Sequence, residues 1–217
     1  MKIALIGVGN LGFSIAQGIV QQQDLEVEQL IVTKRNVTGL KEKFESDRVV
    51  VTSSNVEAVQ QSDVVILCVQ PGQINTILDE IKDELQVSKH LVISTITGRA
   101  IKDIEAVINK EIAIIRAMPN TAISVGQSMT CLSANQHAQD QLSISQQIFN
   151  AVGETLVIEE SMMQAATVIC ASGIAFWMRL IRATTQGAIQ LGFDGVAVKG
   201  FLWGMGNNPI EQFAKLI

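Results

Sequence analysis

The chain has 217 residues and a net charge of −5, and 47% of its residues are hydrophobic while only 17% are charged. This length and apolar content predict a well-buried globular protein and exclude a disordered chain, and the lack of a dense basic run argues against a nucleic-acid partner. The three cysteines show no CxxC spacing, which favours a reducing cytoplasm over a secreted disulfide framework. We therefore expect a cytoplasmic protein without a secretory leader.

The first stretch of the chain predicts a nucleotide-binding turn. Met1–Ile6 is an apolar run able to form a buried strand, Gly7-Val8-Gly9-Asn10-Leu11-Gly12 follows, and residues 13–20 have a helical composition. In this spacing the first glycine allows a tight turn, the second lets the backbone approach a pyrophosphate, and the third lets the helix pack closely on the strand. The positive end of the helix would then face the phosphates. Since glycines also serve ordinary turns, a plain strand-to-helix turn is the alternative.

The end of the second predicted strand bears on the choice of cofactor. Leu30–Thr33 is this strand, and the residues at its end are Thr33, Lys34, Arg35 and Asn36. An NAD-binding unit carries an Asp or Glu here for the ribose 2′-hydroxyl, whereas basic and small polar groups accommodate a 2′-phosphate. The sequence therefore favours NADP(H) over NAD(H), the alternative being that the two basic residues are solvated loop charges.

Strands alternate with helices through residue 120. Strands are predicted at 49–52, 64–69, 91–94 and 112–115, and helices at 55–62, 74–85 and 100–108. Asn55 is the candidate cap of the first of these helices. This alternation predicts an α/β fold with a doubly wound (Rossmann) parallel sheet. A strand at 129–133, a helix at 136–152 and a strand at 154–158 complete the predicted nucleotide-binding domain, residues 1–159.

From Ser161 the pattern changes to helix without strands, so residues 160–217 form a predicted helical dimerisation and substrate domain. Its most apolar run, Ala165–Met178, has 14 residues and is closed by Arg179 and Arg182. That run is too short to span a bilayer and predicts a buried helix, without membrane association. A tail this apolar needs a further surface, and a second copy of the chain would supply one, giving a homodimer or a higher homo-oligomer.

The sequence offers no side-chain set for hydrolysis or metal binding. The two histidines, His90 and His137, lie beside Lys89 and among glutamines, and both are predicted at the surface. Two histidines and scattered cysteines do not make a zinc cluster, and no GxSxG elbow occurs. Hydride transfer needs fewer catalytic side chains, because the cofactor carries the chemistry. The site is expected where the carboxyl ends of the first, fourth, fifth and sixth strands meet the helical tail.

Five stretches resemble the Δ1-pyrroline-5-carboxylate reductase family in order and approximate spacing. They are Gly7–Gly12, Ser54–Ala58, Asp63–Pro71, Ile115–Thr121 and Ala171–Phe176. The Arg-x-Met-Pro-Asn-Thr part is the most specific, and the resemblance runs roughly to Phe193. It implies an oxidoreductase that reduces the ring imine of pyrroline-5-carboxylate with NADPH to L-proline, the last step of proline biosynthesis.

Candidate site residues follow from the motifs and from this resemblance. At the glycine loop and the second strand end, the candidate cofactor contacts are Ile6, Gly7, Val8, Gly9, Asn10, Leu11, Gly12, Thr33, Lys34, Arg35 and Asn36. The resemblance adds Asn55 at the adenosine ribose, Cys68, Val69, Gln70 and Pro71 beside the nicotinamide, and Thr95, Ile96 and Thr97 in the next loop. For the substrate it implies Met118, Pro119, Asn120 and Thr121 as a floor, with Ser172 and Gly173 at the start of a helix. No proton donor is assigned, because the imine can arrive already protonated.

The chain also departs from the family pattern. Gln70 stands where the family usually has Lys, and Ala171–Ala175 (Ala-Ser-Gly-Ile-Ala) replaces Gly-Ser-Gly-Pro-Ala. The family's Ser-Pro-Gly-Gly-Thr-Thr stretch, which binds the substrate carboxylate, does not occur before the chain stops at Ile217. Either the real molecule has residues outside this sequence, or this is a reduced relative that lacks part of the pocket. An intact mass above 23.5 kDa would indicate the first.

Two other functions stay open at this point. One is a related NADP-dependent reductase with another hydride partner, such as a deazaflavin, although Arg116–Thr121 argues against it. The other is a non-catalytic nucleotide-binding protein, which the missing carboxylate-binding stretch suggests.

Overall fold

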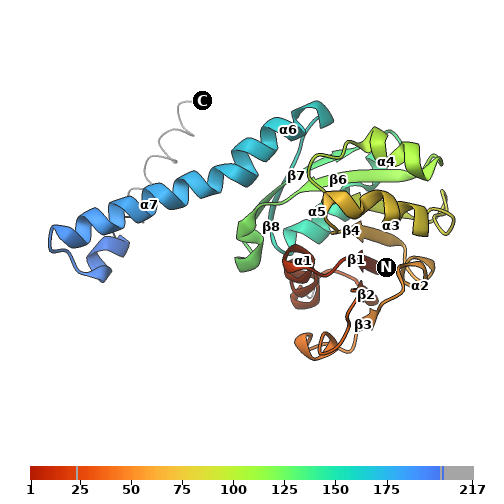
Figure 1. The fold of residues 1–217 in the computed structure, drawn as a ribbon, viewed down its shortest axis with the longest axis horizontal. Helices are drawn as coiled ribbons and strands as arrows, with labels where there is room; N and C mark the ends of the chain where they lie inside the picture. Colours follow the sequence, from red (N-terminus) through yellow and green to blue (C-terminus); the bar gives the residue numbers. More distant parts are fainter. Residues whose placement is uncertain (23, 201, 203–217) are drawn as a thin grey trace. The chain divides into compact units, whose positions relative to one another are not determined.

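The computed structural model describes residues 1–22, 24–200 and 202 (Figure 1). The chain divides into two compact units, Met1–Ala171 and the residues from Ser172 onward. The sequence pattern sets the domain boundary at residues 159 and 160, whereas Glu160–Ala171 belong to the first compact unit. The end of the predicted helical domain, residues 203–217, lies outside the described residues.

The first unit is built on one sheet of eight strands in the order β3-β2-β1-β4-β5-β6-β7-β8 (Figure 1). The strands are β1 Lys2–Ile6, β2 Gln29–Thr33, β3 Val49–Thr52, β4 Val64–Leu67, β5 Leu91–Ser94, β6 Ala113–Met118, β7 Ser128–Ala134 and β8 Gly153–Val157. All neighbours are parallel except β6 and β7, which pair antiparallel because the chain turns back through the short connection 119–127. The predicted doubly wound sheet is confirmed, with one antiparallel pair near its edge.

Helices cover both faces of this sheet. They are α1 Asn10–Gln21, α2 Asn55–Gln60, α3 Ile74–Ile81, α4 Ile101–Ile108, α5 Leu142–Asn150 and the short α6 Met163–Ala166. Alternate side chains of β1 point to opposite faces: Ile3 and Leu5 pack with α1 and α5, while Ala4 and Ile6 pack with α2, α3 and α4. The central strands are therefore buried on both sides, which is why their sequences are uniformly apolar.

The helix predicted at 136–152 begins later than the pattern suggested. A 3₁₀ turn at Gln139–Gln141 precedes α5, which starts at Leu142. Asn135 directly follows β7, and its buried side-chain amide donates to the Ile112 carbonyl at 2.9 Å and accepts from the Ile114 amide at 3.1 Å. These bonds hold the chain at residue 135 beside β6, so α5 begins further along the chain.

The prediction that His90 lies at the surface is wrong. Its side chain is buried, Nδ1 accepts from the Gln86 amide at 2.9 Å, and Nε2 lies 3.2 Å from the Val59 carbonyl. A neutral ring with its proton on Nε2 satisfies both contacts. Burial, followed by the positive charge of Lys89, lowers the pKa of His90. His137 is partly exposed, and its ring contacts the Gln136 side chain.

In the second unit the main element is helix α7, Gly173–Gln190, which follows a π-helical stretch, Thr167–Ser172. The predicted burial of the apolar run 165–178 is wrong for the single chain: Phe176 is 69% exposed and Trp177 is 62% exposed. The remaining described part of this unit, residues 191–200 and 202, is too short to cover an 18-residue helix that is apolar on several sides.

The burial of His90 generates a prediction about acid stability. Because the folded protein holds this ring neutral, the unfolded chain binds more protons as the pH falls through about 6.5, so the His90 contribution is complete above that pH and is lost below it. We expect the loss of unfolding free energy between about pH 7.5 and about pH 5.5 to be smaller in His90→Gln than in the wild type, as measured by urea unfolding.

His137→Gln is the matched control for this experiment, because its ring is partly exposed and should leave the wild-type pH dependence in place. The same loss in wild type and His90→Gln would contradict the prediction.

Candidate functional site

The glycine loop joins β1 to α1 in a space that excludes side chains. Gly7 has φ +93°, and a Cβ there would lie 2.6 Å from Val69 Cγ1 and 2.9 Å from the Cys68 carbonyl oxygen. A Cβ on Gly12 would lie 2.6 Å from the Gly7 oxygen, whereas a Cβ on Gly9 would meet nothing within 4 Å. Two glycines therefore permit close packing of backbone on backbone, and the middle one leaves open space beside the first turn of α1.

That space opens into a cleft of about 400 Å³ at the carboxyl ends of β1, β2 and β4. The predicted cofactor residues that line it are Ile6, Gly7, Val8, Gly9, Thr33, Lys34, Arg35, Asn36, Asn55, Cys68, Val69 and Gln70. The predicted residues outside its lining are Asn10, Leu11, Gly12, Pro71, Thr95, Ile96 and Thr97. The lining also contains Ser53, Gln73 and Ile77, which the sequence reasoning missed. Ser53 and Gln73 follow predicted strand ends by a few positions, whereas Ile77 lies in the predicted helix 74–85, and no motif distinguishes any of the three.

A chain of hydrogen bonds ties the glycine loop to the far wall of the cleft. The Gly7 amide donates to Thr33 Oγ1 at 3.3 Å, and that hydroxyl donates to Asn55 Oδ1 at 2.7 Å. The Asn55 amide nitrogen in turn donates to Glu80 at 3.0 Å. Thr33 is buried, so its side chain fixes the distance between the loop and the start of α2.

These contacts correct the predicted helix cap. Asn55 is the first residue of α2, and the cap is Ser54, whose Oγ accepts from the Glu57 amide at 3.2 Å. Because the Asn55 side chain is held by Thr33 and Glu80, it faces the cleft and not its own helix end.

Lys34 and Arg35 lie exposed at the rim of the same cleft, and the cleft lining contains no acidic residue among the described residues. Two positive charges at the end of β2 make this rim a suitable position for a phosphate group. An acid that could bind a ribose 2′-hydroxyl is absent from that lining.

At the end of β4, the Cys68 thiol is held in its protonated form. Burial raises the pKa of Cys68 to about 12, against a smaller lowering by the hydrogen bond from Thr95 Oγ1 at 3.4 Å. The same Thr95 hydroxyl reaches the Leu67 carbonyl at 3.0 Å. A thiol in this state is not a nucleophile near neutral pH, so Cys68 can only shape the wall.

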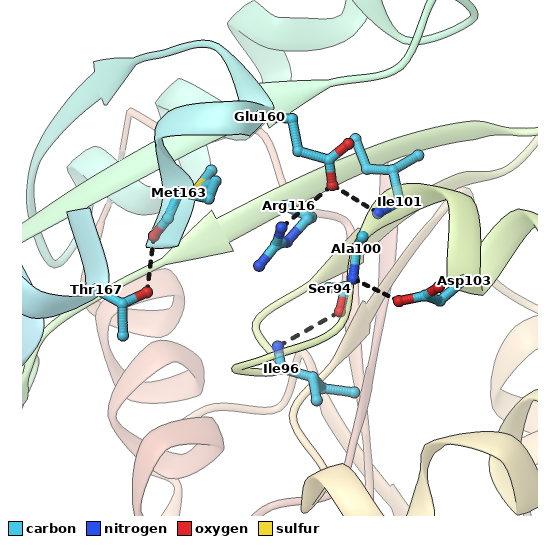
Figure 2. Close-up of polar contacts among 9 residues, drawn as sticks. All are labelled: Ser94, Ile96, Ala100, Ile101, Asp103, Arg116, Glu160, Met163 and Thr167. Carbon is cyan, nitrogen blue, oxygen red and sulfur yellow. Dashed lines mark hydrogen bonds and ion pairs between the residues drawn. The ribbon is translucent and has the colours of Figure 1, made fainter. Parts of the chain in front are cut away.

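A second cavity, of about 710 Å³, lies beside β6, and the ion pair between Arg116 and Glu160 forms part of its lining. Figure 2 shows Glu160 between two partners: its Oε1 accepts from Arg116 at 3.1 Å and from the Ile101 amide at 2.6 Å. Asp103 meanwhile accepts from the Ala100 amide at 3.1 Å, so acidic groups satisfy two amides at the start of α4. Arg116 and Glu160 were not predicted as site residues, because their pairing joins positions 44 apart in sequence.

The predicted substrate floor begins where β6 ends. Met118 and Pro119 are buried, Thr121 is exposed, and Asn120 caps the turn that follows by accepting from the Ala122 amide at 3.1 Å. Asn120 also donates to the Cys170 carbonyl at 3.1 Å. Thr97 lines the second cavity, and its hydroxyl lies 3.9 Å from the Met118 sulphur. Ser172 and Gly173 belong to the second unit, at the start of α7.

Taken together, the described residues form a nucleotide-sized cleft with a phosphate-compatible rim, and none of its side chains is an activated nucleophile. Among these residues no group of three or more histidine, cysteine or acidic side chains is placed to hold a metal ion. Such an arrangement suits redox chemistry in which a bound cofactor supplies the reactive atoms.

Comparisons with known proteins agree with this geometry. The family described as NADP oxidoreductase, coenzyme F420-dependent, matches residues 2–98. Pyrroline-5-carboxylate reductase 2 of Dictyostelium discoideum is 35% identical over 207 residues, which cover 88% of this chain and 69% of that protein. Pyrroline-5-carboxylate reductase 1 of the same organism is 40% identical over 203 residues, which cover 88% of this chain but only 36% of that protein.

Solved structures show the same likeness. The structure of a pyrroline-5-carboxylate reductase from Coxiella burnetii superimposes with a TM-score of 0.86 at 31% identity, covering 96% of this chain and 79% of that one. The match therefore includes the sheet, the cleft and the helical part beyond residue 160. The chain belongs to the pyrroline-5-carboxylate reductase family.

Proposed function

We propose that this protein reduces the cyclic imine of pyrroline-5-carboxylate to L-proline with NADPH as hydride donor. The observation that carries the proposal is the cleft between the glycine loop and Asn55, with Lys34 and Arg35 at its rim, in a chain of this family. In the reaction the imine carbon gains a hydride and the nitrogen keeps or gains a proton. The protein's own task is to bind, orient and exclude water.

Each part of the cleft then has a defined task. The loop residues Gly7, Gly9, Asn10 and Leu11 would hold the pyrophosphate at the start of α1, and Gly12 allows α1 to begin close to β1. The basic rim takes the 2′-phosphate, which makes NADP(H) the preferred cofactor. Asn55, already oriented by Thr33, binds the adenosine ribose.

The chemistry would take place where the cleft reaches the end of β4 and at the neighbouring strand ends. Residues 68–71 and 95–97 lie beside the nicotinamide, and Cys68 contributes as a neutral wall. Residues 118–121 would form the substrate floor, and Ser172 and Gly173 remain predicted substrate contacts. This chain covers 69% of the D. discoideum reductase 2 sequence, and we assign no described residue to the substrate carboxylate.

A second candidate is a reductase whose hydride partner is a deazaflavin. It is favoured by the F420-dependent family match, which covers residues 2–98. The Arg116–Thr121 stretch lies outside that match and belongs to the part shared with the pyrroline-5-carboxylate reductases. We therefore place this candidate second.

We also propose that α7 pairs with a second copy of the chain in the cytoplasm. Exposed apolar side chains include Phe176, Trp177 and Leu180, and burying them would stabilise an assembly. By length and composition alone, the helical stretch Glu160–Gln190 contains an 18-residue window that is apolar enough to cross a membrane. Arg179 and Arg182 interrupt this stretch, which makes pairing between copies the better account.

The first test is oxidation of NADPH in the presence of pyrroline-5-carboxylate, run beside a titration of NADPH binding. We expect the protein to oxidise NADPH with this substrate. The intact mass of the same sample is compared with the 23.5 kDa of this chain. Tight NADPH binding without turnover would contradict the assigned substrate and would favour another hydride partner or a non-catalytic role.

The second test concerns cofactor preference. NADPH should bind more tightly than NADH, and Arg35→Asp should weaken NADPH binding by about tenfold or more while leaving NADH binding nearly unchanged, because only NADPH carries the 2′-phosphate. Lys43→Asp, on the exposed 3₁₀ turn Lys41–Lys43 outside the cleft, is the charge-matched control. Equal affinities for the two cofactors in the unchanged protein would remove the case for the phosphate site.

The third test concerns assembly. In light scattering, the wild type should have about twice the mass of one chain or a higher multiple, and the double variant Phe176→Glu, Trp177→Glu should shift to the monomer. Both side chains are exposed in the single chain, so the substitutions leave its packing intact. Gln186→Glu, exposed on the same helix, is the control. A monomeric wild type would refute the pairing.

A further inference from the structure

Two cysteines far apart in sequence meet at the edge of the first unit. Cys131 lies on β7 and Cys170 lies in the π-helical stretch 167–172, and their sulphur atoms are 4.0 Å apart. A disulfide needs about 2.05 Å between sulphurs, so the two atoms require an approach of about 2 Å. Neither cysteine is in a disulfide, and neither has a role in the nucleotide cleft.

The two thiols differ in their exposure to solvent. Cys131 is 1% exposed, in a small apolar cluster with Met118, Met163 and Ala166, whereas Cys170 is only partly buried against that cluster. A soluble oxidant can therefore reach Cys170 first. Once Cys170 has reacted, Cys131 is the sulphur next to it.

The segment that carries Cys170 can accommodate a small movement. Residues 167–172 form a π-helical turn, a wider geometry than the α-helix that is commonly found as a local bulge at functional positions. By contrast, Cys131 is held by the ladder between β6 and β7, where it pairs with Met118. The movement that closes the sulphur gap is thus expected in the helical turn and not in the sheet.

We propose that Cys131 and Cys170 form a reversible intramolecular disulfide when the protein meets a peroxide. The Cys170 thiolate attacks one peroxide oxygen and becomes a sulfenic acid while hydroxide leaves and is protonated to water. The Cys131 sulphur then attacks the Cys170 sulphur, a second water leaves with the Cys131 proton, and the disulfide forms. Two thiols and one hydrogen peroxide thus give one disulfide and two waters, and a small-molecule dithiol reverses the change.

The raised pKa of Cys131 agrees with this order of steps. Burial first, and then the neighbouring Cys170, raises the pKa of Cys131 to about 11. In the reduced protein Cys131 is therefore a protonated, protected thiol, and it acts as the resolving partner. The third cysteine, Cys68, has the higher pKa of about 12 and bonds to Thr95, so it stays outside the exchange.

The disulfide would act on the substrate side of the protein. The carbonyl of Cys170 accepts from Asn120 Nδ2 at 3.1 Å, and the backbone amide of Asn120 donates to Ser128 Oγ at 3.2 Å. Moving Cys170 toward β7 changes the partner of Asn120 and the residues just before Ser172. Any change in turnover that this movement causes rests on the proposed function, whereas the formation of the disulfide does not.

The experiment treats the native, reduced protein with hydrogen peroxide, alkylates the free thiols in denaturant after the oxidant is removed, and maps the peptides by mass spectrometry with and without reduction. We expect the wild type to lose about 2 Da, to keep one alkylated thiol at Cys68 and to yield a linked peptide pair containing Cys131 and Cys170. Hydrogen exchange should change around Asn120 and residues 167–172, while NADPH affinity stays within about twofold, because the cleft contains neither cysteine.

Cys68→Ser is the matched control and should form the same link, whereas Cys131→Ser and Cys170→Ser should not. The wild-type peptide map decides the matter even if a variant fails to fold. Sulfinic acid at Cys170 without a link to Cys131, a disulfide between two chains, or two unreacted thiols would each overturn the proposal. Since none of these results uses turnover, they separate this proposal from the proposed reductase activity.

Discussion

The structure depends on how closely the backbone of β1 and α1 approaches the end of β4. A side chain at Gly7 or Gly12 would collide with the Cys68 carbonyl, with Val69 or with the Gly7 oxygen itself. With hydrogen at those positions, the loop packs against the neighbouring strand end, and the open side of the turn, at Gly9, faces the cleft. The position of the nucleotide cleft, between β1 and its two neighbours, is a direct result of this steric constraint.

Buried polar groups then fix the parts that the apolar core leaves free. An apolar core is not directional, so it cannot by itself set the distance between two loops. Thr33 sets that distance at the glycine loop, Asn135 holds the end of β7 beside β6, and Glu160 joins Arg116 to the first amide of α4. Each of these groups has at least two partners, which offsets the cost of removing it from water.

The helical part differs, because the described residues of the second unit beyond α7 are too few to cover the apolar surface of that helix. Phe176, Trp177 and Leu180 are each more than half exposed, and a soluble protein rarely leaves such a surface open. The first unit satisfies its apolar strands internally, with helices on both faces. The two units therefore differ in kind: the first buries its apolar strands within one chain, whereas apolar side chains of α7 are exposed in the described part of the second.

Much of the first unit could be predicted from local patterns. Uniform apolar runs predicted the strands, their alternation with helices predicted the doubly wound sheet, and the glycine spacing predicted which turn lines the cleft. These patterns succeed because backbone geometry and strand burial act over a few residues. For the same reason the basic pair at the end of β2 was found at the rim of the cleft.

The remaining features depended on partners distant in sequence. His90 was predicted exposed from its polar neighbours, but Val59 supplies a buried acceptor 31 positions away. Asn55 was predicted to cap its own helix, but Thr33 and Glu80 compete for its side chain. Local sequence thus determined the elements, the glycine turn and the charge of the rim. Only the tertiary structure decided which side chains meet, including Arg116 with Glu160 and Cys131 with Cys170, because hydrogen bonds and ion pairs require contacts that no short stretch of sequence contains.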